Sequence, residues 1–143
     1  MKRIFRLIVV LFFVFACESE KKQYTKLGSK KTNIDFVNKL YETNTRNYFT
    51  NPYRYLGGGV AAGDFNNDGL QDIYFAGNLV DDKMYLNQGN LKFKDVTKKS
   101  GIINDGGWST GVTIADVNND GYVDIYVVVV VLLGSYSYSA LQL

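Results

Sequence analysis

The sequence has no histidine, a single cysteine and a single proline among its 143 residues. Without histidine the chain cannot form a Ser-His-Asp triad, use a histidine base or bind zinc through imidazole. One cysteine excludes an internal disulfide and a cysteine-rich metal cluster. A formal net charge of +2 is too small to favour nucleic acid as a partner. The length predicts one domain at most, and 46% hydrophobic with 15% aromatic residues is typical of a globular β-rich chain.

The N-terminus has the pattern of an export signal. Residues 1–17 read MKRIFRLIVVLFFVFAC, in which three basic residues are followed by ten apolar ones, Leu7–Ala16. This pattern predicts a signal peptide, because a membrane span needs about 20 apolar residues; the alternative is a buried core element. The end of the run, Val14-Phe15-Ala16-Cys17, resembles a bacterial lipobox. The resemblance implies lipidation at Cys17 and a membrane partner through the lipid anchor.

Two further segments precede the main pattern. Residues 18–31 are charged and polar without periodicity, and we interpret them as a flexible tether. Glu18 and Glu20 follow the predicted lipidated cysteine and hint at surface export. Residues 32–58 form a lead-in segment. Its aromatic part, Tyr48–Tyr55, is interpreted as packing against the β unit that follows it, with a carbohydrate or peptide platform as the alternative.

An internal repeat dominates the rest of the chain. GVAAGDFNNDGLQDIYF (59–75) and GVTIADVNNDGYVDIYV (111–127) share ten of 17 residues at an offset of 52. Each copy reads as strand, polar loop, strand, with the first strands at Val60–Gly63 and Thr110–Ala115. Met84, Leu86, Leu91 and Phe93 predict a following hairpin with one buried face. Residues 59–109 therefore predict a four-stranded unit, and residues 110–127 predict the start of a second one.

The two polar loops have the spacing of a calcium loop. Both read D-x-N-x-D-G-x-x-D, in which oxygen side chains at positions 1, 3 and 5 can converge where the glycine at position 6 allows a sharp turn. A carbonyl at position 7 and the carboxylate at position 9 complete six or seven oxygens. An all-oxygen set favours two Ca²⁺ sites with a structural role; the alternative is a pair of metal-free Asx-rich turns. The predicted ligands are Asp64, Asn66, Asp68, Leu70, Asp72, Asp116, Asn118, Asp120, Tyr122 and Asp124.

GDFNNDGLQDIYF and ADVNNDGYVDIYV resemble FG-GAP/VCBS repeats, the units of integrin-α-like β-propellers. The wider stretch, with IDFVNKL at 34–40, is similar to the start of VCBS-repeat lipoproteins of Bacteroidetes-type bacteria that carry an ASPIC/UnbV domain. The resemblance implies an all-β fold, a partial β-propeller of about one and a half blades. It also implies an outer-membrane lipoprotein of the cell envelope that binds a protein or glycan.

The C-terminal residues 128–143 depart from the repeat pattern. A polar turn and another hairpin are expected there, but the chain reads VVVVLLGSYSYSALQL. We interpret this tail as the product of a frameshifted or truncated gene, with a short lipoprotein that oligomerises as the alternative. A non-functional fragment is the corresponding alternative for function.

Catalysis is not expected of this chain, because no pair of acids outside the loops has a spacing that favours acid–base work. A polysaccharide-acting envelope enzyme is kept as the less favoured alternative. The adjacent pair Asp81 and Asp82 is predicted to be solvated. Trp108 is predicted to pack between blades, and Gly57–Gly59 to allow a close backbone approach where the first blade begins.

Overall fold

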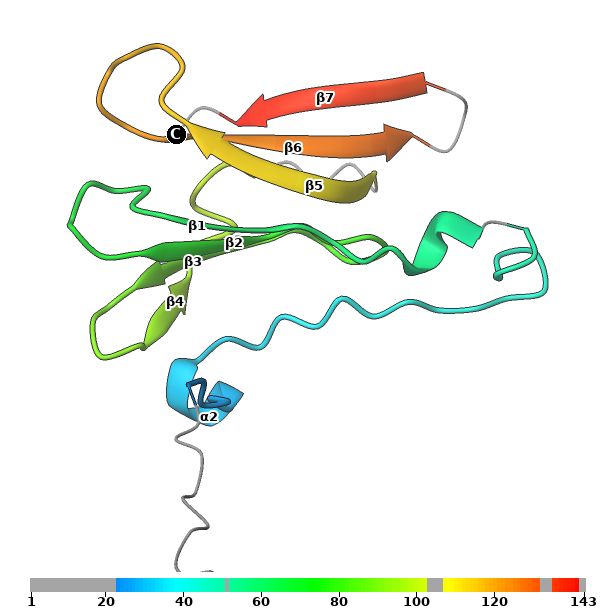
Figure 1. Cartoon of the computed structure of the whole chain (residues 1–143), viewed down its shortest axis with the longest axis horizontal. Helices are drawn as coiled ribbons and strands as arrows, with labels where there is room; N and C mark the ends of the chain where they lie inside the picture. The colour runs from blue at the N-terminus through cyan, green and yellow to red at the C-terminus, as the bar shows by residue number, and fades with distance from the viewer. Residues whose placement is uncertain (1–22, 51, 103–106, 132–134, 142–143) are drawn as a thin grey trace, which may run out of the picture.

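The computed structural model describes residues 23–50, 52–102, 107–131 and 135–141. These residues form two antiparallel sheets with almost no helix, which confirms the all-β fold class (Figure 1). Helical structure in the described part is confined to α2 (Ser29–Thr32) and the 3-10 turn Pro52–Tyr55. No closed propeller is formed by the described residues. The strands are β1 (Val60–Gly63), β2 (Asp72–Phe75), β3 (Lys83–Asn87), β4 (Phe93–Asp95), β5 (Trp108–Ala115), β6 (Asp124–Val131) and β7 (Ser135–Leu141).

The first sheet is a simple meander of four strands in the order β1-β2-β3-β4. The predicted hairpin is present between β3 and β4, but the prediction that Leu91 faces the core is wrong. Leu91 is 51% exposed and has a φ of 56°. The turn extends as far as Leu91, because Asn90 also has a positive φ and Lys92 N–H closes the turn on Gly89 O at 3.0 Å.

The second sheet has three strands in the order β5-β6-β7. β5 begins at Trp108, two residues earlier than the sequence predicts, and an irregularity between Ser109 and Gly111 shifts its register against β6. β6 continues through the valine run to Val131 and pairs with β7 along its length. The described residues of the atypical tail, 128–131 and 135–141, are therefore sheet in this structure.

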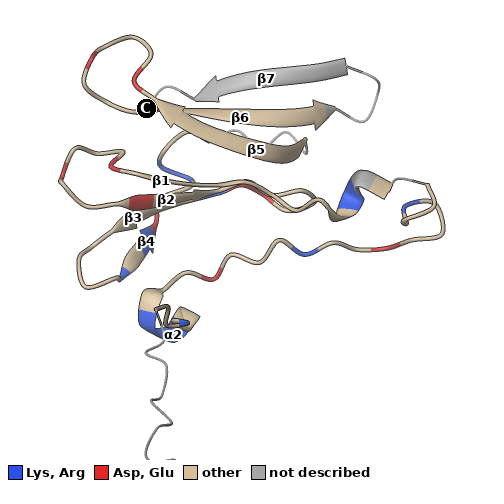
Figure 2. Cartoon of the chain, viewed as in Figure 1, with Lys and Arg blue, Asp and Glu red and all other residues tan. Residues whose placement is uncertain are grey.

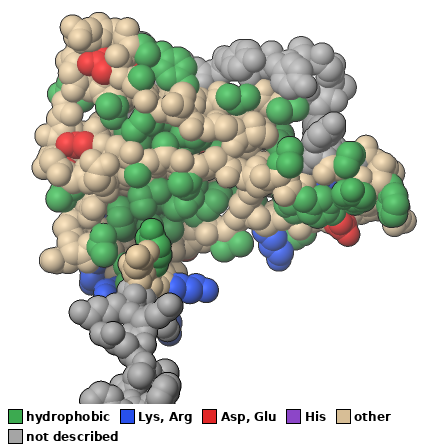
Figure 3. All heavy atoms as spheres, in the orientation of Figure 1, with side chains coloured by type: hydrophobic (Ala, Val, Ile, Leu, Met, Phe, Trp, Pro, Cys, Tyr) green, Lys and Arg blue, Asp and Glu red, His purple; other side chains and the backbone are tan. Residues whose placement is uncertain are grey.

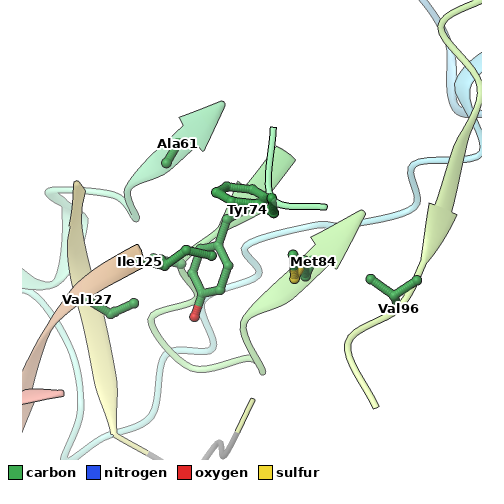
Figure 4. Close-up of a cluster of buried hydrophobic side chains, with 8 residues drawn as sticks. Ala61, Tyr74, Met84, Val96, Ile125 and Val127 are labelled. Carbon is green, nitrogen blue, oxygen red and sulfur yellow. The ribbon is translucent and has the colours of Figure 1, made fainter. Parts of the chain in front are cut away.

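The main core lies between the two sheets, which contribute opposite faces of the same repeated motif (Figure 4). From the first sheet it contains Tyr74 and Met84, exposed by only 2% and 3%. From the second it contains Ile125 and Val127, exposed by 0% and 5%. Each copy of the repeat has an Ile-Tyr pair, whose two side chains point to opposite faces of the strand. The first sheet turns the tyrosine of its pair, Tyr74, toward the interface, and the second sheet turns the isoleucine of its pair, Ile125, toward it.

The other face of the first sheet is covered by the lead-in segment, which crosses it as an extended chain (Figure 1). Its even-numbered residues from Ile34 to Leu40 are partly buried and its odd-numbered residues are exposed. Phe36 stacks on Phe75 with ring centroids 4.8 Å apart. Tyr85 donates its hydroxyl to Asp35 Oδ1 at 2.6 Å. The first sheet is thus enclosed on both faces.

Close backbone approach occurs at the start of β1, as the run of glycines predicts. A Cβ at Gly58 would lie 2.0 Å from Ala76 O, and one at Gly59 would lie 2.8 Å from Thr110 O. Any larger residue would push the lead-in and β5 away from the first sheet. These contacts bring β1 beside β5, and with them the loops that follow each strand.

Candidate metal centres

Both acidic loops lie on the same side of the molecule, one above the other (Figure 2). The first joins β1 to β2 and the second joins β5 to β6. The two loops are adjacent because β1 and β5 are neighbours and both loops leave their strands in the same direction. The repeat at offset 52 in the sequence therefore becomes a pair of neighbouring loops in space.

The first loop is folded by its own side-chain oxygens. Asp64 accepts hydrogen bonds from Asp68 N–H at 3.0 Å and Gly69 N–H at 2.7 Å. Asn66 Oδ1 also accepts from Asp68 N–H, and Asp68 Oδ1 accepts from Leu70 N–H at 2.8 Å. Gly69 has a φ of 83°, the left-handed conformation that position 6 of the motif requires. The side chains at positions 1, 3 and 5 thus line one curled backbone.

The second loop repeats this network bond for bond. Asp116 accepts from Asp120 N–H at 3.2 Å and Gly121 N–H at 2.9 Å. Asn118 Oδ1 accepts from Asp120 N–H at 3.0 Å, and Asp120 Oδ1 accepts from Tyr122 N–H at 2.9 Å. Gly121 has a φ of 88°. Because two independent sequence copies adopt one geometry, the motif itself determines the loop conformation.

The carboxylates at position 9 close each loop from the sheet side. Asp72 is fully buried and accepts from Phe65 N–H at 3.0 Å and Asn87 N–H at 2.7 Å. Burial raises the pKa of Asp72, the negative charges of Asp68 and Asp64 raise it further, and the two N–H donors oppose this. Asp124 is 2% exposed and accepts from Val117 N–H at 3.0 Å in the same way.

The donor chemistry fits a hard cation, although the loops in this structure have the Asx-turn form. No group of three or more Asp, Glu, Cys or His side chains in the described ranges is close enough together to hold a metal ion. Each carboxylate oxygen that accepts one hydrogen bond keeps a second lone pair for a cation. Asp64 and Asp68 act on the pKa of Asp72 through their charge, so they lie near it.

The predicted carbonyl ligands occupy comparable places in the two loops. Leu70 and Tyr122 are 37% and 46% exposed, and the N–H of each donates to the carboxylate at position 5. The exposed side chains of both residues agree with the expectation that any ligand from position 7 is the backbone carbonyl. The predicted lipidation residue, Cys17, and the signal peptide lie outside the described residues.

Asp82 is a buried polar centre that the sequence analysis missed. The prediction that Asp82 is solvated is wrong, because its exposure is 5%; Asp81 is exposed. Asp82 Oδ2 accepts from Tyr74 OH at 2.7 Å and Ser109 Oγ at 3.0 Å, and Oδ1 accepts from Gly77 N–H at 2.7 Å. The carboxylate thereby ties the first sheet to β5. An acid beside another acid in a turn gives no periodic signal, so sequence alone could not place it.

Two other predicted features lie at the side of the molecule opposite the loops. Trp108 is 7% exposed, as expected of a packing residue, and the Arg54 guanidinium lies 5.4 Å from its ring centroid. The prediction that the aromatic segment Tyr48–Tyr55 packs against the first blade is wrong for Phe49, Tyr48 and Tyr55, which are 93%, 57% and 48% exposed. Apolar side chains gather on this end of the surface, around the 3-10 turn (Figure 3).

None of the helices in the described segments is long and apolar enough to cross a bilayer.

Comparison with known families agrees with the repeat. The family model described as "FG-GAP-like repeat" matches residues 64–127, a range that contains both acidic loops. An FG-GAP-like repeat is therefore present in this chain, and its two antiparallel sheets are consistent with a fragment of such a fold. No curated protein and no solved structure gives a significant match.

Proposed function

We propose that the chain is a calcium-stabilised, propeller-like binding module of an exported lipoprotein. The observation that carries this proposal is the pair of D-x-N-x-D-G-x-x-D loops, which fold alike at two places within the FG-GAP-like repeat. Asp64, Asn66, Asp68 and Asp72 would hold one Ca²⁺, with Asp116, Asn118, Asp120 and Asp124 holding the other. The ion would offset the repulsion among three carboxylates in each loop and fix the loop to its sheet.

The calcium proposal is tested by thermal unfolding of the full chain in detergent, with Ca²⁺, Mg²⁺ or a chelator. One site saturated at 100 times its Kd adds about 2.7 kcal/mol, so we expect calcium to raise Tm by about 10 °C or more. Asp68→Asn and Asp120→Asn should each remove part of this gain, and the double variant should remove nearly all of it. Asp81→Asn, an exposed acid outside the loops, is the matched control.

The outcome separates the competing interpretations. Equal Tm values in calcium and chelator would contradict the metal proposal and favour metal-free Asx turns. Absence of any cooperative unfolding transition in either condition would favour the non-functional fragment. The lipoprotein part has its own test, which is the intact mass of the product from membranes of the source cell. A lipid-modified species beginning at Cys17 supports the anchor, and an unmodified or uncleaved chain contradicts it.

Binding rather than catalysis is supported by the aromatic end of the molecule. Phe49 and Tyr48 project from a segment whose backbone is fixed by Asn47, which accepts from Phe49 N–H at 3.0 Å and Thr50 N–H at 3.2 Å. Exposed aromatic side chains on an ordered segment are a feature of interaction surfaces. A protein or glycan is the proposed ligand class, located at the envelope surface.

A further inference from the structure

The two acidic loops are joined by a hydrogen bond that the repeat does not require. Asn67 Nδ2 in the first loop donates to Gly121 O in the second at 2.9 Å. Asn67 is at position 4 of its motif, between the two candidate ligands Asn66 and Asp68, and is not itself a predicted ligand. The bond reaches from one loop directly into the backbone of the other.

The acceptor belongs to a peptide unit that also holds a candidate ligand. The C=O of Gly121 and the N–H of Tyr122 form one planar peptide. Tyr122 N–H donates to Asp120 Oδ1 at 2.9 Å, while Gly121 O accepts from Asn67. The orientation of this peptide is therefore held at one end by the first loop and at the other by a carboxylate of the second loop.

We propose that Asn67 is a positioning residue that couples the two metal loops. Asn67 orients the peptide between Gly121 and Tyr122, and this peptide aims the Asp120 carboxylate in the second loop. Ordering of the first loop around its own ion fixes Asn67, so occupancy of the first site tightens binding at the second. By linkage, the second ion strengthens the first site by the same factor. This inference rests on the calcium binding proposed above.

The repeat supplies a matched control within the same chain. Asn119 occupies position 4 of the second loop, and its φ of 59° is close to the 56° of Asn67. Within the described segments, the Asn119 side chain makes no hydrogen bond to the first loop. Glycine accepts a positive φ without strain, so Asn67→Gly and Asn119→Gly remove the side chain with equal backbone consequences. Only the first substitution removes the bond between loops.

Tyr122 allows the second loop to be observed by itself. Tb³⁺ replaces Ca²⁺ on oxygen ligands, and its emission is sensitised by an adjacent tyrosine. Tyr122 is at position 7 of the second loop, where the first loop has Leu70. Titration of the full chain with Tb³⁺ under tyrosine excitation reports the second site, and Tyr122→Phe confirms the assignment by abolishing the signal. The double variant Leu70→Tyr/Tyr122→Phe moves the reporter to the first loop.

We expect Asn67→Gly to weaken Tb³⁺ binding at the second loop by about threefold to tenfold, the equivalent of one net hydrogen bond. Asn119→Gly is measured in the variant that carries the tyrosine reporter in the first loop. It should leave the Tb³⁺ affinity of the first loop unchanged. In the metal-free chain, Asn67→Gly should also shift the backbone amide resonance of Tyr122, because Gly121 O in the same peptide no longer accepts a hydrogen bond from Asn67. A general loss of packing would instead lower Tm without this local signature.

The outcomes distinguish the coupling from the sites themselves. Two binding sites with an unchanged second-loop affinity in Asn67→Gly would overturn the coupling and leave the calcium proposal intact. Equal cross-loop effects of Asn67→Gly and Asn119→Gly would overturn it as well, because only one of the two side chains bridges the loops. Absence of Tb³⁺ and Ca²⁺ binding at both loops would overturn the calcium proposal and the coupling together.

Discussion

The two sheets begin with nearly the same sequence and end in different environments. In the first, the Tyr74 face packs on the second sheet and the opposite face is covered by the lead-in through Phe36. In the second, Ile125 faces the shared core, and Tyr126 lies on the side away from it and is only partly buried. The repeat therefore determines the strands and loops, whereas the neighbour on each face of a strand determines which of its side chains form a core.

The residues that follow the second strand of each repeat also differ in sequence. Between β2 and β3 the first sheet has a turn that contains Asn78 and Asp82, both buried and hydrogen-bonded. At offset 52 from Asp82 the sequence has Gly134, so the second repeat does not carry an acid at the equivalent position. The first sheet is thus stabilised by a polar centre as well as by apolar packing.

The largest difference between the sheets should come from removing that polar centre. Asp82→Ala leaves Tyr74 OH, Ser109 Oγ and Gly77 N–H without their acceptor in a buried place. We expect a loss of about 3 kcal/mol in the free energy of unfolding, measured by urea denaturation in saturating calcium. Asp81→Ala, its exposed neighbour, should change stability by less than about 0.5 kcal/mol. Equal effects would show that Asp82 does not join the sheets.

A smaller difference is expected at the tyrosine of the repeat. Tyr74→Phe removes one hydroxyl that donates to Asp82 Oδ2 at 2.7 Å, and a bond to a carboxylate contributes about 1.5–3 kcal/mol. Tyr126→Phe is the same change at the equivalent place in the second sheet, and it should cost less than about 0.5 kcal/mol. Urea denaturation of both variants measures the difference. A larger cost at Tyr126 would mean that its face is covered in solution.

The sequence predicts those features whose signal is local. β1 has the bounds that were expected, because its apolar residues end abruptly at the acidic loop. Both loops follow from the motif, since the side chains at positions 1, 3 and 5 each accept a hydrogen bond from a backbone N–H within five residues. The network of Asp82 was missed because it joins residues from three separate segments. Leu91 was misplaced because positive φ values at Asn90 and Leu91 lengthen a turn that alternation alone cannot define.

The sequence of the lead-in also contains a periodic signal. Ile34, Phe36 and Leu40 stand at even positions of the lead-in, a partial period of two that predicts an extended segment with one covered face. The apolar Val37 and the polar Asn38 break this pattern, although Asn38 is partly buried in the structure. Which face of which sheet this segment covers could not be read from the sequence, because that depends on the distant ring of Phe75. Long-range pairing was therefore the main information missing from the sequence.

The smallest expected effect lies at the edge of the first sheet, where Lys83 Nζ lies 2.6 Å from Asp95 Oδ2. Partial burial alone would raise the pKa of Asp95, but hydrogen bonds from Lys83 and Thr97 outweigh it, so the pKa is lowered. A carboxylate whose pKa is lower in the folded state than in the unfolded state stabilises the fold at any pH above its unfolded-state pKa. This contribution is lost as the pH falls through the folded-state pKa. The loss should therefore occur below about pH 4.

Both partners of this pair are about one-third exposed, so solvent screening limits its contribution to about 0.5 kcal/mol. The measurement is unfolding free energy against pH, in chelator, for the parent chain and Asp95→Asn. We expect the variant to lose only this small acid-dependent part. If the parent shows a much steeper loss of stability in acid that Asp95→Asn leaves unchanged, the carboxylates responsible lie elsewhere, and the acidic loops hold six of them. Repetition in saturating calcium then shows whether the ion shifts that loss to lower pH, as competition between protons and calcium for the same oxygens requires.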